Sequence, residues 1–129
     1  MKAITLLIFF YYSILIFDTY QQIYINELIG KWEVVKITEN DMDISSTIDK
    51  NAQRWLEFIS DDRYNSDGYP FGRYEGEYIL DENAGTLVLK SGSANTKSIT
   101  WQARYDGEYL ILNGTGQLQH YKFFLSKVF

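Results

Sequence analysis

The sequence predicts an all-β protein, an antiparallel up-and-down β-barrel of seven to eight strands preceded by a short N-terminal helical segment. Short runs in which apolar and polar residues alternate recur along residues 32–128, and turn signals separate them at close intervals. No amphipathic helical pattern of useful length follows residue 28. A meander of this length tends to curl and close, because closure removes both exposed sheet edges.

Composition indicates one folded domain with a substantial core. The chain has 129 residues, of which 46% are hydrophobic and 17% aromatic. Its net charge of -5, without any basic cluster, argues against nucleic acid as a partner. The absence of cysteine excludes disulfides, thiolate nucleophiles and zinc ribbons.

Residues 1–17 form a hydrophobic leader. Lys2 precedes fifteen almost wholly apolar residues, a pattern that resembles a secretory signal. The run is shorter than the roughly 20 apolar residues of a membrane-spanning helix. We therefore expect an exported protein, periplasmic or extracellular, whose domain covers residues 18–129; the alternative is a buried N-terminal strand or helix. No small-x-small pair precedes Asp18, so cleavage is left open.

The first half of the domain is predicted to contain a helical turn and two strands. Asn26 could cap a single turn that ends at Gly30. Residues 32–38 are apolar on both faces, which predicts either a bulge or a strand covered on both sides. Residues 39–53 form a polar connection that could hold a short helical turn, and residues 54–60 form the next strand.

The second half is predicted to contain five more strands, at residues 72–80, 86–90, 97–105, 108–112 and 118–128. Residues 63–65 supply an eighth strand if they pair. Asp106-Gly107 and Asn113-Gly114 indicate tight hairpin turns, because both central positions of a type I′ turn need positive φ.

Alternation along these strands predicts an aromatic barrel interior. The residues expected to line it are Phe58, Tyr74, Tyr78, Trp101, Tyr105, Tyr121 and Phe123. Such side chains either form the walls of a pocket for a planar or acyl ligand or simply fill the barrel. Gly76 and Ala103, which are small and face the same way, are expected to leave space beside the tyrosines.

Several segments together resemble the small bacterial lipocalin-like domains of the calycin type. They are "LIGKWEVV", "WLEFISDDRY", "GRYEGEYILDENAGTLVL", "ITWQARYDGEYLIL" and "HYKFFLSKV", which cover residues 27–128. The resemblance implies a barrel closed at one end, where the tryptophan of Gly30-x-Trp32 packs against a cation from the last strand. Lys127 matches that cation by position. Lipocalins bind small apolar molecules, so the resemblance also implies such a ligand.

The polar constellations do not predict catalysis or a metal site. The loop at residues 60–68 resembles a calcium loop, but Arg63 stands at a ligand position. Glu75 and Glu77 share a strand face with Arg73, as expected for a solvated outer surface. His120 is the only histidine. We therefore expect no enzymatic activity, no cofactor and no metal.

Two functions are consistent with these patterns. The first is an exported lipocalin-like domain that binds a small apolar or aromatic ligand inside the barrel, with entry near residues 39–53 and the turn at 69–72. The second is a filled barrel that acts as a protein-binding or inhibitory module of the cell envelope. Its contact patch would be the outward aromatics Trp55, Tyr69, Phe71 and Phe124. Neither fixes the oligomeric state.

Overall fold

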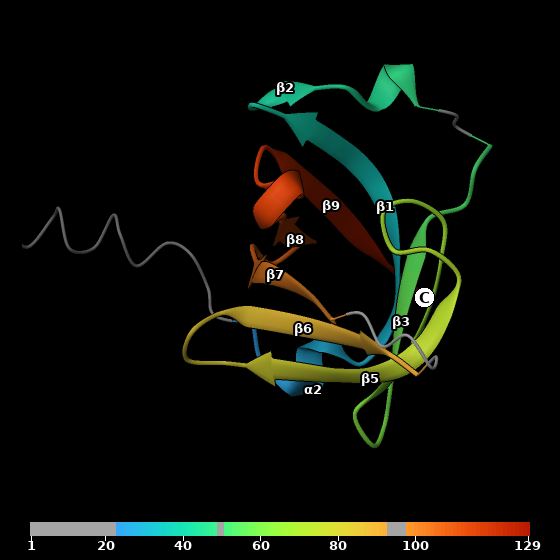
Figure 1. The fold of residues 1–129 in the computed structure, drawn as a ribbon, viewed down its shortest axis with the longest axis vertical. Coiled ribbons are helices and arrows are strands. Elements are labelled where there is room, and N and C mark those ends of the chain that lie inside the picture. The colour runs from blue at the N-terminus through green and yellow to red at the C-terminus, as the bar shows by residue number, and fades with distance from the viewer. Residues whose placement is uncertain (1–22, 49–50, 93–97) are drawn as a thin grey trace, which may run out of the picture.

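The computed structural model describes residues 23–48, 51–92 and 98–129 (Figure 1). The predicted leader at residues 1–17 lies outside these ranges. The elements are α2 (Ile25–Leu28), β1 (Gly30–Glu39), β2 (Met42–Asp43), the 3₁₀ turn η1 (Ser45–Thr47), β3 (Trp55–Ile59), β4 (Arg63–Asp67), β5 (Tyr74–Asp81), β6 (Thr86–Ser91), β7 (Ser98–Tyr105), β8 (Tyr109–Asn113), the 3₁₀ turn η2 (Gly116–Leu118) and β9 (Tyr121–Val128).

The strands form one antiparallel sheet in the order β2-β1-β3-β4-β5-β6-β7-β8-β9. β1 also pairs with β9, so eight strands close into a barrel and β2 extends one end of β1. This confirms the predicted all-β, up-and-down barrel. Among the described residues, no helix has the length and apolar character needed to cross a membrane.

β1 changes faces at a bulge. Its first residues, 30–33, pair with β3, whereas almost the whole strand pairs with β9, with a shift in register between Val34 and Lys36. Trp32 before the shift and Ile37 after it both point into the core, while Val35 is exposed. The bulge thus explains the apolar residues on both faces of this segment.

The strand at residues 63–65 does pair, and it extends to Asp67 as β4. Tyr64 and Ser66 face the interior, and the Ser66 hydroxyl donates a hydrogen bond of 2.7 Å to the Gly72 carbonyl. This bond holds the β4–β5 connection against the barrel.

Two local predictions were wrong, and a third was correct only in part. Asn26 lies inside α2 and does not cap it, because the helix begins one residue earlier, after Tyr24. Asn113-Gly114 does not form a two-residue hairpin turn. The β8–β9 connection instead runs through η2, and β9 begins at Tyr121. The β7–β8 turn is tight, but its central residues are Gly107 and Glu108, because Asp106 bonds Tyr109 and only Gly107 has a positive φ, of 96°. The Asp106 carboxylate accepts hydrogen bonds from the amides of Glu108 and Tyr109.

Gly76 does not leave the space that the alternation pattern suggested. A Cβ at this position would fall on the carbonyl oxygen of Lys90 in the neighbouring strand β6. The glycine is needed because two backbones approach each other closely here, so no room for a ligand results from it.

We expect Gly76→Ala to lower the free energy of unfolding by about 2–3 kcal/mol, because the added methyl group must push β5 away from β6. Gly92→Ala is the matched control, since a Cβ there would lie 3.4 Å from the Glu75 carbonyl oxygen, an ordinary contact. Its effect should be within about 0.5 kcal/mol. Urea unfolding measures both, and equal stabilities for the two variants would contradict the close approach.

Candidate functional site

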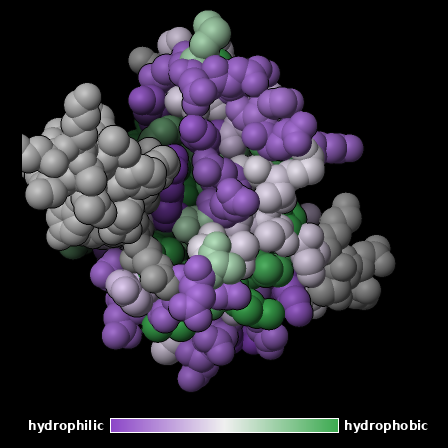
Figure 2. Space-filling model, turned by 90° about the vertical axis from the view of Figure 1, so that its left-hand side faces the viewer, coloured by the Kyte–Doolittle hydropathy of each residue, from purple (hydrophilic) through white to green (hydrophobic). Residues whose placement is uncertain are grey.

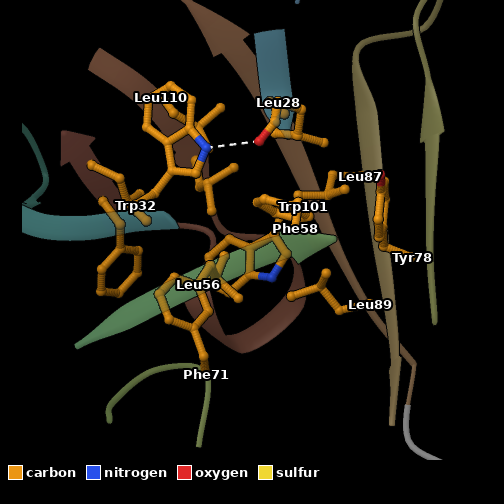
Figure 3. Packing of buried hydrophobic residues seen from close by; sticks show 14 of the residues in the cluster. Leu28, Trp32, Leu56, Phe58, Phe71, Tyr78, Leu87, Leu89, Trp101 and Leu110 are labelled. Carbon is orange, nitrogen blue, oxygen red and sulfur yellow. Dashed lines mark hydrogen bonds between the residues drawn. The ribbon is translucent and has the colours of Figure 1, made fainter. Parts of the chain in front are cut away.

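One end of the barrel is closed by Trp32. The indole is buried, with 1% of its surface exposed, and its Nε1 donates a hydrogen bond of 2.8 Å to the carbonyl oxygen of Leu28 (Figure 3). That carbonyl lies at the end of α2, where no helical partner remains for it. The bond therefore fixes α2 across the barrel end and satisfies two buried polar groups at once.

Gly30 and Lys127 complete this end. The Lys127 Nζ lies 5.5 Å from the centroid of the Trp32 ring and donates a hydrogen bond of 3.3 Å to the Glu27 carbonyl. Gly30 has a φ of 132°, and a Cβ there would lie 2.7 Å from the Lys127 Cε. Glycine is therefore favoured at position 30 both by its backbone conformation and by the close approach of the Lys127 side chain.

The centre of the barrel is filled by aromatic and leucine side chains. Phe58 and Tyr78 meet edge to face with ring centroids 5.0 Å apart, and Trp101 meets Phe123 at 5.5 Å. All four are buried. Burial raises the pKa of the Tyr78 hydroxyl, with a smaller contribution from Asp62, so this group stays neutral. These four residues come together as a packed core.

The other three predicted lining residues lie nearer the ends of the barrel. Tyr105 packs on Trp32 at 6.0 Å, and its hydroxyl donates to the Gly107 carbonyl. Tyr121 stacks on Phe123 at 6.4 Å and is only partly buried. Tyr74 is not enclosed, because 45% of its surface is exposed. It begins β5, and its ring lies over Gly72, where a Cβ would approach within 2.6 Å.

Sequence reasoning missed several residues that fill the interior. They are Tyr64, Phe71, Leu87, Leu89, Leu110 and Leu112, whereas Leu56 and Leu125 point inward as strand alternation predicts. Most of them alternate within predicted strands, so the pattern that identified the aromatics could also have identified the leucines. Together they occupy space that a ligand would otherwise use.

Phe71 closes the second end of the barrel. It was expected to point outward, yet only 3% of its surface is exposed, and its ring lies 5.7 Å from Trp101 and 6.3 Å from Phe123. Strand alternation does not apply to residues 68–72, which form a turn in which the amides of Phe71 and Gly72 both bond the Gly68 carbonyl. The turn folds Phe71 inward and leaves Tyr69 half-exposed over Phe123.

A cleft of about 580 Å³ opens on the barrel wall beside β1. The Val34 amide of β1 donates a hydrogen bond to the Arg54 carbonyl, which lies just before β3. After this bond β1 bulges and turns away from β3. The segment after β2 returns to β1 through a bond from the Ile44 amide to the Ile37 carbonyl. We call the space between them the β1 cleft. Its lining is Val34, Val35, Lys36, Ile37, Asp43, Ser45, Ser46, Ile48, Ala52 and Arg54.

Hydrogen bonds around Ser45 shape one side of the β1 cleft. The Ser45 amide donates to the Asp43 carboxylate at 2.8 Å, and the Ser45 hydroxyl accepts from the Ile37 amide at 3.0 Å. The bonds from Ser45 hold the pKa of Asp43 below its ordinary value. Asp43 is therefore ionised at neutral pH and serves to fix η1 beside β1.

The remaining polar motifs lie on the surface of the barrel. In the loop after β3, Asp61 and Asp62 adopt positive φ and form a turn. Glu75 and Glu77 are exposed on the outer face of β5. His120 is exposed beside Gln119. Within the ranges the structure describes, no three His, Cys, Asp or Glu side chains gather closely enough to hold a metal ion.

No protein-family model, curated protein or solved structure matches this chain. What is known of its class therefore comes from the structure itself, which is a closed antiparallel barrel of eight strands with one additional strand. This architecture is compatible with the lipocalin-like resemblance of the sequence.

We expect Phe71→Ala to lower the free energy of unfolding by about 3–5 kcal/mol, because it opens a cavity against Trp101 and Phe123. Tyr69→Ala, in the same turn, should cost about 1 kcal/mol or less, since Tyr69 is 54% exposed. Chemical denaturation of both variants measures the difference. A Phe71 variant as stable as the Tyr69 variant would show that the second end is not sealed in this way.

Proposed function

We propose that the protein is an exported, lipocalin-like binding protein that holds a small apolar ligand with an anionic head, and that the ligand occupies the β1 cleft. The observation that carries this proposal is the cleft itself. Its volume of about 580 Å³ falls within the ~300–1,000 Å³ typical of small-molecule sites. The barrel centre, where the sequence led us to expect the ligand, is occupied by packed side chains.

The lining of the β1 cleft suggests the chemistry of the ligand. Val34, Val35, Ile48 and Ala52 give the β1 cleft an apolar portion against which an acyl chain or flat ring can bury surface. Lys36 and Arg54 contribute two cations and Asp43 one anion; the Lys36 Nζ also lies over the Phe124 ring, and Asp43 binds Ser45. An apolar molecule that carries a carboxylate or similar group therefore fits this lining better than a neutral one.

We propose binding rather than catalysis. The lining of the β1 cleft combines aliphatic side chains, two serines, two cations and one carboxylate. The carboxylate is committed to the turn at Ser45, and its lowered pKa suits a structural anion better than a general base at neutral pH. A cofactor is not part of this proposal.

A protein partner remains the alternative prediction, but the patch expected for it is broken up. Phe71 is buried, Lys31 Nζ lies over the Trp55 ring at 4.5 Å, and Lys36 Nζ lies over Phe124 at 5.0 Å. Tyr69 alone of the four aromatics is largely exposed. These side chains do not form one apolar surface of the kind that hot spots usually need.

The proposal is tested by calorimetric titration with decanoate and with decanol. We expect saturable, one-to-one binding of decanoate and weaker binding of decanol, because decanol lacks the charge that Lys36 and Arg54 attract. Ala52→Trp should fill the β1 cleft and weaken decanoate binding at least tenfold, or about 1.4 kcal/mol.

Ala84→Trp is the matched control, since Ala84 is an exposed alanine in the β5–β6 turn, away from the cleft. It should leave decanoate binding unchanged. If both tryptophan variants bind decanoate like the original protein, the ligand does not occupy the β1 cleft. If decanoate shows no saturable binding, the proposed ligand class is wrong.

A further inference from the structure

The closed end of the barrel carries apolar side chains on its outside. We call them the floor surface, and its exposed members are Tyr24, Ile25, Ile29, Ile59, Val128 and Phe129. They come from α2 and from the ends of β3 and β9. The register brings these segments together, because Gly30 lies opposite Phe58 on one side, and Lys31 lies opposite Val128 on the other.

On the face of the molecule seen in Figure 2, most hydrophobic groups lie in the lower half, the end at which α2 lies in Figure 1, where they alternate with hydrophilic groups. The upper half of this face is mostly hydrophilic. At the opposite end of the barrel, Met42 is exposed but its neighbours in the β1–β2 turn are Asn40, Asp41 and Asp43. Tyr69 and Tyr74 are also exposed, at the end of the barrel that Phe71 closes, but the floor surface carries six exposed apolar side chains on three adjoining segments.

The sequence places the hydrophobic leader next to this floor surface. Residues 3–17 are almost wholly apolar, and only residues 18–22 separate them from Ile23, which is fully buried in the core beside α2. Six Cα–Cα steps join Phe17 to Ile23, so even an extended connection keeps the end of the apolar run within about 22 Å of Ile23. Ile23 directly precedes Tyr24 of the floor surface.

We propose that the leader is retained in the full chain and that the floor surface rests on a lipid bilayer. A run of fifteen almost wholly apolar residues is shorter than the roughly 20 that span a membrane comfortably, so a second apolar contact from the domain strengthens a weak anchor. The net charge of -5 favours a zwitterionic bilayer over an anionic one. In this orientation the opposite end of the barrel, with β2 and η1, points away from the lipid.

The absence of cysteine allows a direct test, because a single introduced cysteine can be labelled specifically. The full chain is bound to phosphatidylcholine vesicles and labelled with an environment-sensitive fluorophore at Phe129→Cys or at Met42→Cys. Both positions are highly exposed, and they lie at opposite ends of the barrel. Nitroxide-labelled lipids then report the contact of each label with the bilayer.

We expect the label at position 129 to be quenched about threefold more strongly than the label at 42, as for groups held in the interfacial layer. Ile25→Asp together with Ile29→Asp should reduce that quenching to the level at position 42. Ile79→Asp, an exposed isoleucine on the outer face of β5, is the control and should leave it unchanged. The proposal would be overturned if the labels at 129 and 42 were quenched equally, or if the Ile25 and Ile29 substitutions left the quenching at 129 unchanged. It would also be overturned if the full chain did not bind vesicles. None of these outcomes bears on decanoate binding in the β1 cleft.

Discussion

The structure depends on the double pairing of β1, which bonds β3 on one edge and β9 on the other. This pairing joins the first and last strands and closes the barrel, and it gives the apolar side chains an enclosed interior. β1 cannot follow both neighbours over its full length. β1 stays paired with β9 along almost its whole length, with a bulge between Val34 and Lys36, and its pairing with β3 ends there. The gap that opens between β1 and β3 is the β1 cleft. The same constraint thus produces the core and the candidate site.

Closure of the two barrel ends explains why the candidate site lies in the wall. Trp32 seals one end through packing and its hydrogen bond to Leu28, and Phe71 seals the other by inserting from a turn. Between them, rings and leucines bury apolar surface, which contributes about 25 cal/mol per Å² removed from water. A ligand in the centre would have to displace these side chains and lose that stabilisation. A ligand in the β1 cleft displaces only solvent.

Much of the fold could be predicted from the sequence, because strand alternation records which side of a sheet is buried. It located the strands other than the short β2, offered the bulge in β1 as one of two explanations, and placed Trp101 and Phe123 inside. Alternation could not place Phe71, because the position of that side chain depends on a turn. It also did not predict that Tyr74, at the start of its strand, is exposed. Gly76 was misread as space, since only the path of β6 shows that a second backbone passes there. The β1 cleft also escaped prediction, because it arises from where two strands separate.

The central claim is that Trp32 seals a closed and well-packed barrel end. Hydrogen exchange of the tryptophan indole protons, followed by NMR in deuterated buffer, tests it most directly. We expect the Trp32 Nε1 proton to exchange only through global unfolding, at least about a thousandfold more slowly than that of the partly exposed Trp55. A Trp32 proton that exchanges as fast as the Trp55 proton would show that this end is open to water, and both the sealed interior and the cleft as the favoured site would then have to be abandoned.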